Sequence, residues 1–227
     1  MAASSSHVVT IDGPAASGKS STAQWVADTL GWLHIDSGSL YRAATWARLR
    51  QPGAAATWND ASVIAAAEEA QVTLRAEARA FAPFAGDHSL GDAIRSVEVT
   101  ADVSHVAQMP TVRAWVNARL QAAAQGRDVI VDGRDMGTVV FPDAPLKIWL
   151  VADPWERARR RLTQRLERRP SDEEIAAETD ELVQRDARDA TQTVQAKNAV
   201  LVDTTYLTQP EQVERIVALA RAVALKR

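Results

Sequence analysis

The sequence contains no cysteine among its 227 residues. Disulfide bonds, thiolate catalysis and cysteine-ligated zinc sites are therefore excluded. It also has no apolar run near the roughly 20 residues that a membrane-spanning helix needs, so we expect no membrane partner. The start, Met1-Ala-Ala-Ser-Ser-Ser6, lacks a basic group followed by an apolar stretch, and it predicts a loose tail over residues 1–6 rather than a secretory signal. A reducing cytoplasm fits these features.

A strong positive charge is also missing. The chain has 26 basic and 29 acidic residues and a net charge of −3, which argues against a general nucleic-acid binder. Its arginines are nevertheless uneven, because seven of them fall within the thirteen residues from Arg157 to Arg169. A local arginine cluster in a mildly acidic protein indicates a small anionic ligand.

Short apolar runs alternate with segments of helical period along most of the chain. Ala23, Val26, Ala27 and Leu30 share one helical face before Gly31 ends that pattern. The alternation predicts an α/β fold with a parallel sheet of about five strands and helices on both faces. The predicted strands are His7–Ile11, Trp32–Ile35, Val129–Val131, Leu146–Val151 and Ala199–Val202.

Two segments interrupt this alternation, and we read the chain as a single domain, residues 1–227, with two excursions. Short extended pieces between Val72 and His88 predict a small antiparallel insertion, which extends over about residues 63–108. A charged helical region over about residues 153–190 forms the second excursion. We find no internal repeat and no low-complexity linker.

Capping signals divide the second excursion into helices. Asp153-Pro154 predicts a helix start, Arg169-Pro170 its end, and Ser171-Asp-Glu-Glu174 a capping box that opens the next helix. The last helix is predicted to begin at Pro210-Glu211 and to end in Lys226-Arg227, whose charges suit a helix C-terminus.

The segment from Gly13 to Ser20 reads Gly-Pro-Ala-Ala-Ser-Gly-Lys-Ser and matches the pattern G-x-x-x-x-G-K-[ST]. Glycines let such a loop curl its N–H groups around phosphate oxygens, the lysine adds a charge near the β and γ phosphates, and the last hydroxyl binds Mg²⁺. The alternative is a glycine turn with a surface lysine. A strand before the loop and an amphipathic helix after it favour the phosphate site. The residues expected to bind ATP are Gly13, Pro14, Ala15, Ala16, Ser17, Gly18, Lys19, Ser20 and Ser21, with Ser20 as the metal ligand.

Other users of this loop carry signals that are missing or weak here. A signalling GTPase is expected to show N-K-x-D, and none is found. A motor or transporter ATPase is expected to show four apolar residues before Asp-Glu, whereas Asp132 is followed by Gly133. Arginines instead follow two predicted strands, at the carboxyl edge where ligands of open α/β sheets bind. Their planar forks suit phosphate.

Four motifs occur in order along the chain. They are Gly13-Pro-x-x-Ser-Gly-Lys-Ser20, Asp36-Ser-Gly-x-x-Tyr-Arg42, Asp132-Gly-Arg-Asp-Met-Gly-Thr-Val-Val-Phe-Pro142 and Arg185-Asp-x-Arg-Asp189. Together they resemble bacterial cytidylate kinases over nearly the whole chain. The resemblance implies a core parallel sheet, a monophosphate-binding insertion and a mobile lid, which correspond to the two excursions.

The resemblance also implies roles for the acceptor side. Arg42 and Arg134 clamp the phosphate of a nucleoside monophosphate, and Asp132 orients arginines or metal-bound water. The remaining implied substrate contacts are Ser37 and Tyr41 lining the pocket, Ser104, Arg113 and Asp135 at the base, and Arg185, Arg188 and Asp189 near the ribose. Arg113 could instead belong to a solvated helix face, Ser104 could be a surface serine, and Gly133-Arg-Asp135 could be a turn with a surface ion pair.

Arg157, Arg161 and Arg165 share one helical face at i, i+4 spacing. Most arginines of this region can be a solvated charged face, but we expect Arg157 or Arg161 to close on the transferring phosphoryl group. The predicted catalytic residues are Lys19, Arg134, Arg157, Arg161 and Arg185. One position departs from the family: Gln192 stands where many relatives carry an arginine, which puts the acceptor contacts in question.

The predicted function is transfer of a phosphoryl group from ATP to CMP or dCMP, with Mg²⁺, in pyrimidine nucleotide metabolism. We expect alignment and charge stabilisation rather than a catalytic base. Alternatives are a kinase for AMP, UMP or shikimate, and an ATP-hydrolysing switch without an acceptor. We expect a cytoplasmic monomer with no nucleic-acid or membrane partner.

Overall fold

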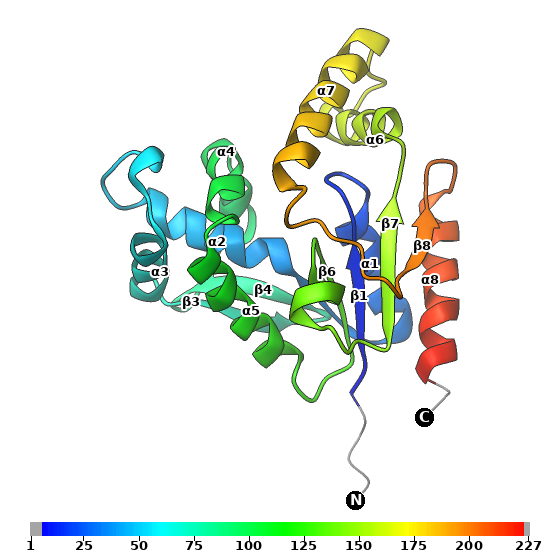
Figure 1. Cartoon of the computed structure of the whole chain (residues 1–227), viewed down its shortest axis with the longest axis horizontal. Helices are drawn as coiled ribbons and strands as arrows, with labels where there is room; N and C mark the ends of the chain where they lie inside the picture. Colours follow the sequence, from blue (N-terminus) through cyan, green and yellow to red (C-terminus); the bar gives the residue numbers. More distant parts are fainter. Residues whose placement is uncertain (1–5, 225–227) are drawn as a thin grey trace, which may run out of the picture. The chain divides into compact units, whose positions relative to one another are not determined.

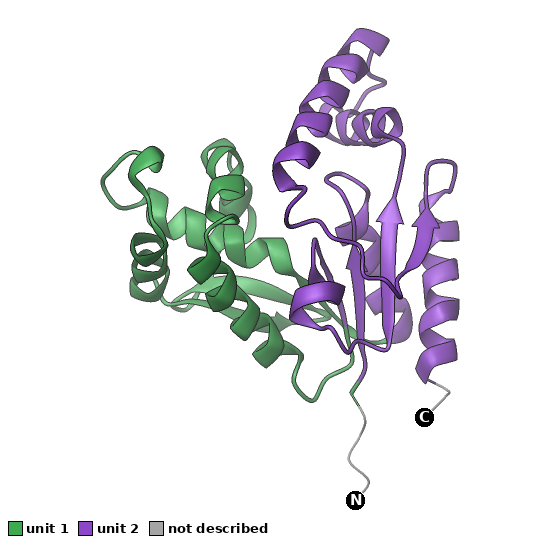
Figure 2. Cartoon of the chain, viewed as in Figure 1, with its two compact units in different colours: residues 1–6, 31–129 green, residues 7–30, 130–227 purple. Residues whose placement is uncertain are grey.

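The computed structural model describes residues 6–224, and these divide into two compact units (Figure 2). Residue 6 and residues 31–129 make up the first unit, and residues 7–30 and 130–224 make up the second. The predicted insertion, residues 63–108, lies within the first unit together with the segments on either side of it. Within the described residues, no helix has both the length and the apolar character to cross a membrane.

The second unit is built on parallel strands. They follow one another in the order β6 (Val129–Gly133), β1 (Val8–Asp12), β7 (Leu146–Val151) and β8 (Val200–Asp203). β7 pairs in parallel with both β1 and β8 (Figure 1). Ile11, Ile130 and Ile148 are at most 1% exposed, because strands covered on both faces bury their side chains in either direction. These strands lie within two residues of the positions that the sequence predicts.

Four helices and one π-helical turn complete the second unit. They are α1 (Lys19–Leu30), η3 (Met136–Val140), α6 (Pro154–Leu166), α7 (Asp172–Asp189) and α8 (Gln209–Ala224). The buried hydroxyl of Thr22 in α1 donates to Gln212 in α8 at 3.2 Å, which joins these two helices. The predicted end of the last helix, Lys226-Arg227, lies outside the described residues.

The α6–α7 hairpin begins and turns largely as its capping signals predict. Asp153 accepts from the backbone N–H groups of Trp155 and Glu156, and Ser171 forms a capping box with Glu174. The prediction that α6 ends at Arg169-Pro170 is wrong by three residues. Glu167 adopts a left-handed conformation with φ of 54°, which ends the helix after Leu166.

The first unit contains the antiparallel strands that the sequence predicts between Val72 and His88. β3 (Val72–Glu77) and β4 (Ala80–Ala85) form a hairpin, and β5 (His88–Ser89) pairs with β4. The hairpin is not separate from the parallel strands, because β4 pairs in parallel with β2 (Leu33–Asp36).

Helices of the first unit pack around α2 (Ser37–Leu49), whose Leu40 and Ala43 are fully buried. α2 contacts both α3 and α4 (Figure 1). The other helical elements are η1 (Ala55–Thr57), α3 (Asp60–Glu69), η2 (Gly91–Arg95), α4 (Val97–Val106) and α5 (Pro110–Ala124).

Candidate active site

The predicted phosphate loop connects β1 to α1 in the second unit. Gly13 lies against β7, where a Cβ atom would overlap the carbonyl oxygen of Leu150, so only glycine fits. Ala16 and Gly18 have φ angles of 55° and 87°, which curl the chain back on itself before α1 begins at Lys19. The curled backbone is the conformation that a phosphate cradle requires.

Lys19 is 7% exposed and lies inside this loop. Its ammonium group donates to the carbonyl oxygen of Pro14 at 2.6 Å and to the hydroxyl of Ser17 at 3.3 Å. Burial, followed by the nearby charge of Arg134, lowers the pKa of Lys19 well below its ordinary value, while Asp132 and Asp12 act in the opposite direction. A cation held this way is poised to exchange its loop contacts for phosphate oxygens.

Ser20 and Asp132 bring two oxygen atoms together at the edge of the sheet. The Ser20 hydroxyl donates to Asp132 Oδ2 at 2.7 Å. A hydroxyl beside a carboxylate at the end of a neighbouring strand is the donor set that holds Mg²⁺ in enzymes with this loop. No group of three or more acidic, histidine or cysteine side chains that could hold a metal occurs in the part of the chain that the structure describes.

Asp12 is a functional candidate that the sequence analysis missed. Its carboxylate is 4% exposed and accepts the backbone N–H groups of Met136 and Gly137 at 2.8 Å each. Burial raises the pKa of Asp12 to about 6, although the two N–H groups and Lys19 favour the charged form. Asp12 thus fixes the start of η3 beside the loop. Its position directly after a strand and before Gly13 was the available signal.

Three charged side chains predicted for the acceptor form a chain next to the loop. Arg134 donates to the carbonyl oxygen of Gly13 at 3.3 Å and lies 3.5 Å from Asp189 Oδ2. Arg185 lies 3.9 Å from the same carboxylate oxygen. The alternative reading of Arg134 as half of a surface pair does not describe it, because its side chain is only 25% exposed and reaches the loop backbone.

Asp135 is buried and caps η3, whereas Arg188 is exposed on α7. Gln192, in place of the arginine of many relatives, follows α7 and donates its backbone N–H to the carbonyl oxygen of Asp189.

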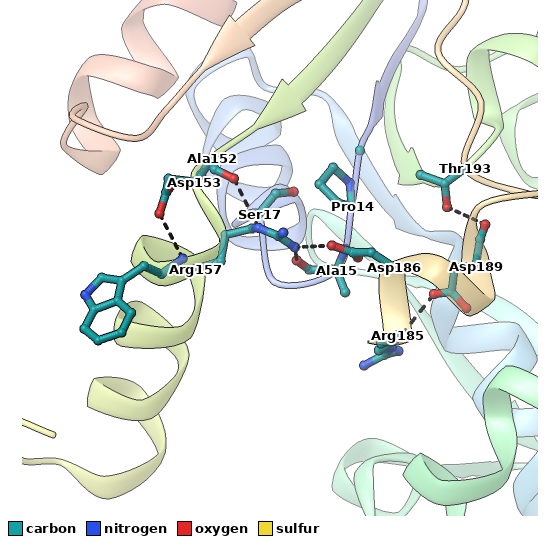
Figure 3. A network of polar contacts seen from close by, with 12 residues as sticks. Pro14, Ala15, Ser17, Ala152, Asp153, Arg157, Arg185, Asp186, Asp189 and Thr193 are labelled. Atoms are coloured by element: carbon teal, nitrogen blue, oxygen red, sulfur yellow. Dashed lines mark hydrogen bonds and ion pairs between the residues drawn. The ribbon is translucent and has the colours of Figure 1, made fainter. Parts of the chain in front are cut away.

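Arg157, which we expected to contact the transferring phosphoryl group, binds protein groups of the phosphate loop and of α7. Its side chain is 4% exposed and lies under the loop, where Nη1 donates to the carbonyl oxygen of Ala15 and to Asp186 Oδ2, both at 2.7 Å (Figure 3). Its Nε donates to the carbonyl oxygen of Ala152 at 3.1 Å. Asp186 was not among the predicted site residues, although it lies within the Arg185-Asp-x-Arg-Asp189 motif.

The other arginines of the predicted lid face pair within the hairpin. Arg161 and Arg165 of α6 each lie 3.0 Å from an oxygen of Glu178 on α7. Glu178 is only 4% exposed, so the two arginines neutralise a buried carboxylate. These contacts join α6 to α7.

The remaining predicted acceptor residues belong to the first unit. Arg42 donates to the hydroxyl of Thr100 at 3.0 Å, and the guanidinium carbon of Arg113 lies 5.9 Å from the centre of the Tyr41 ring. Ser37 is buried at the start of α2, and Ser104 is half-buried on α4. The structure therefore brings Tyr41, Arg42 and Arg113 together around α2.

Comparisons with known proteins agree with these motifs. Residues 9–222 match the family described as Cytidylate kinase. A cytidylate kinase of Stutzerimonas stutzeri is 39% identical over 216 residues, which cover 93% of each chain. A cytidylate kinase of Rhodopirellula baltica is 38% identical, with 94% of this chain and 92% of that protein covered.

The fold also has a counterpart of much lower sequence similarity. The crystal structure of a gluconokinase from Sinorhizobium meliloti is 15% identical, with a TM-score of 0.50 over 96% of this chain and 94% of that one. This likeness concerns the fold alone. The family match and the two relatives carry the assignment, and on their strength this chain belongs to the cytidylate kinase family.

Proposed function

We propose that this protein transfers the γ-phosphoryl group of ATP to CMP, and also to dCMP, giving ADP and CDP or dCDP. The observation that carries the proposal is the buried Lys19 within its curled loop, next to the Ser20–Asp132 pair. In the reaction, the bond from the γ phosphorus to the β-phosphate oxygen breaks, and an oxygen of the acceptor phosphate forms the new bond. Such a transfer needs alignment and charge stabilisation, so no side chain must act as a base.

The second unit carries the donor side of this proposal. The loop from Gly13 to Ser21 surrounds the phosphates of ATP, and its N–H groups from Ala16 onward face them, because Pro14 has no N–H and the Ala15 N–H donates to Asp186. Lys19 moves from the Pro14 carbonyl to the β and γ phosphates. Ser20 and Asp132 would hold Mg²⁺ through the oxygen atoms that now share a hydrogen bond. When bound, Mg²⁺ neutralises the charge that develops on the phosphate oxygens.

The acceptor side of the proposal depends mainly on arginines. Arg42 and Arg134 bind the acceptor phosphate, since a planar guanidinium pairs with two phosphate oxygens. By likeness to the family, the other contacts are Ser37, Tyr41, Ser104, Arg113, Asp135, Arg185, Arg188 and Asp189. Residues 63–108 act as the monophosphate-binding insertion and residues 153–190 as the lid that excludes water during transfer.

A coupled assay of ADP release across a panel of acceptors tests this function. We expect rapid ADP release with CMP and dCMP and a low rate without an acceptor. A higher kcat/KM for UMP, AMP or shikimate would assign a different acceptor. An ATPase rate that no acceptor stimulates would contradict the kinase itself.

We further propose that the protein acts as a monomer in the cytoplasm, within pyrimidine nucleotide metabolism. Sedimentation at micromolar concentration tests the monomer, and a dimer at that concentration would contradict it.

A further inference from the structure

Two side chains of the α6–α7 hairpin form hydrogen bonds with the backbone of Ala15 in the phosphate loop. Arg157 donates to the Ala15 carbonyl oxygen at 2.7 Å, and Asp186 Oδ1 accepts the Ala15 N–H at 3.0 Å. The two side chains are themselves paired at 2.7 Å, so the contacts close a ring through one residue of the loop (Figure 3). Both polar groups of Ala15 are thereby fixed by the hairpin.

Apolar packing reinforces this ring. The Ala15 side chain is 2% exposed and belongs to a buried cluster of the hairpin, whose other members are Ala158, Leu162, Ile175 and Leu182. The Nε of Arg157 also donates a hydrogen bond to the Ala152 carbonyl oxygen. The Arg157 side chain is 4% exposed, and its hydrogen bonds to Ala15, Ala152 and Asp186 hold it against the loop.

The ring determines where the next N–H group points. A trans peptide is planar, with its C=O and N–H pointing in opposite directions. Because the Ala15 carbonyl points to Arg157, the N–H of Ala16 points away from Arg157, and we take that side of the loop as the one that faces phosphate in the proposed function. Ala16 also has a φ of 55°, a conformation that costs an L-residue free energy and needs support from its surroundings.

We propose that Arg157 and Asp186 are positioning residues for the phosphates of ATP. They hold the peptide between Ala15 and Ala16 in its binding conformation before the nucleotide arrives, and Arg157 does not contact the transferred phosphoryl group. Preorganisation of this kind lowers the cost of ordering the loop on binding, so its loss weakens ATP affinity. The inference rests on ATP binding at this loop, as proposed above.

Calorimetric binding of the non-hydrolysable ATP analogue AMPPNP, without any acceptor, tests the proposal on the full chain. Arg157→Gln and Asp186→Asn are each expected to raise the Kd by about tenfold or more, because each removes a charge-assisted hydrogen bond to Ala15 or its partner. Because they remove members of one ring, the double variant should raise the Kd no further than the weaker-binding single variant. The KM for CMP should stay unchanged in all three.

Matched controls come from the tip of the same hairpin. Arg168 and Glu174 pair at 2.6 Å with side chains that are 55% and 37% exposed, so Arg168→Gln and Glu174→Gln should leave the Kd unchanged. If these controls weaken binding equally, general loosening of the hairpin explains the effect and the proposal is overturned. It is likewise overturned if the two site variants are additive.

A third result would also overturn the proposal. If the Kd for AMPPNP is unchanged in both Arg157→Gln and Asp186→Asn, and only Arg157→Gln lowers kcat, then Arg157 contacts the transferred phosphoryl group. If circular dichroism shows that Arg157→Gln does not fold, the Kd of Asp186→Asn for AMPPNP tests the proposal instead. The Asp186 side chain is 24% exposed, so this substitution disturbs the core less. Wild-type protein that binds AMPPNP but fails to phosphorylate CMP contradicts the proposed acceptor and leaves this test intact.

Discussion

Lys19 lies almost out of solvent, with its ammonium held by the Pro14 carbonyl and the Ser17 hydroxyl. Its charge matters most when negative charge builds on the phosphate oxygens during transfer. We expect Lys19→Met to lower kcat by about 100-fold or more, because one preorganised charge is lost from the transition state. The measurement is steady-state ADP release with CMP, alongside a thermal melt that shows an intact fold.

Lys197→Met is the matched control, since Lys197 is exposed and lies beyond α7 in the sequence. Its kcat should equal that of the wild type. Near-normal turnover of Lys19→Met would remove Lys19 from the catalytic set.

Arg134 joins the Gly13 carbonyl to Asp189, and its guanidinium is predicted to clamp the acceptor phosphate. Arg134→Ala is expected to raise the KM for CMP and to lower kcat, because a loosened phosphate is misaligned for attack. Initial rates over a matrix of ATP and CMP concentrations separate the two constants. An effect confined to ATP would assign Arg134 to the donor side.

Asp12 makes stability depend on pH. Its pKa is raised from 3.8 to about 6 in the folded protein, so the folded state binds more protons than the unfolded state between these values. The stability contributed by the protonated carboxyl is therefore complete below about pH 4 and is lost as the pH rises through 6.

Urea unfolding of wild type and Asp12→Asn at a series of pH values measures this contribution. The difference in unfolding free energy, wild type minus variant, should fall by about 2 kcal/mol between pH 4 and pH 7, which is most of the free-energy equivalent of the shift from 3.8 to about 6. A difference that rises with pH, or stays constant, would show that burial does not dominate the titration of Asp12.

At the level of elements, the α6–α7 hairpin depends on a buried carboxylate. Glu178 of α7 meets Arg161 and Arg165 of α6, whose side chains remain 35% and 54% exposed. Removing one partner of a fully buried pair costs several kcal/mol, but solvent screens these arginines, so we expect Glu178→Gln to lower the unfolding free energy by about 1–2 kcal/mol. Chemical denaturation measures the change.

Glu181→Gln serves as the control, because Glu181 is exposed on the same helix. We expect no more than a few tenths of a kcal/mol from it, as for most surface substitutions. Equal losses in the two variants would show that charge on α7, rather than the pairing of Glu178, stabilises the hairpin.

Elements with a local signal were predictable from the sequence. The strand before Gly13, the cap at Asp153 and the capping box at Ser171 depend on neighbours within a few residues, and the structure contains all three. The relation of Arg157 to Ala15 was not predictable, since 142 positions separate them. Helical spacing identifies the face on which Arg157 lies but not the group that receives its hydrogen bonds.

The same limit applies to Asp12 and to the two units. A carboxylate after a strand can face solvent, a metal or backbone N–H groups, and only the position of η3 decides that Asp12 binds Met136 and Gly137. Similarly, the grouping of β2 with the hairpin follows from the pairing of His34 with Ala80, a contact between segments that are distant in the sequence.

At the level of the whole molecule, the two units should respond differently to the two substrates. Hydrogen exchange followed by mass spectrometry can detect this, because bound ligand suppresses local opening. We expect ADP with Mg²⁺ to slow exchange in peptides covering residues 13–21 and to leave α4 and α5 unchanged. CMP alone is expected to slow exchange in α2, α4 and α5, where Arg42 and Arg113 lie.

Protein with Arg42→Ala is the control for the second ligand, and its α2, α4 and α5 peptides should show no slowing with CMP. If CMP leaves every peptide of residues 31–129 unchanged, the first unit does not bind the acceptor. If ADP slows exchange there as strongly as in residues 13–21, the donor is not confined to the second unit.

The position of Ala15, at once in the loop and in the apolar centre of the hairpin, has a consequence for engineering and for divergence. A chimera that receives α6 and α7 from another kinase will inherit a foreign lining around this methyl group, and its loop will be distorted unless the residues that touch Ala15 are transplanted to match. Sequence drift in the hairpin is constrained in the same way: a larger residue at position 15 is tolerated only where Leu162 or Leu182 has become smaller.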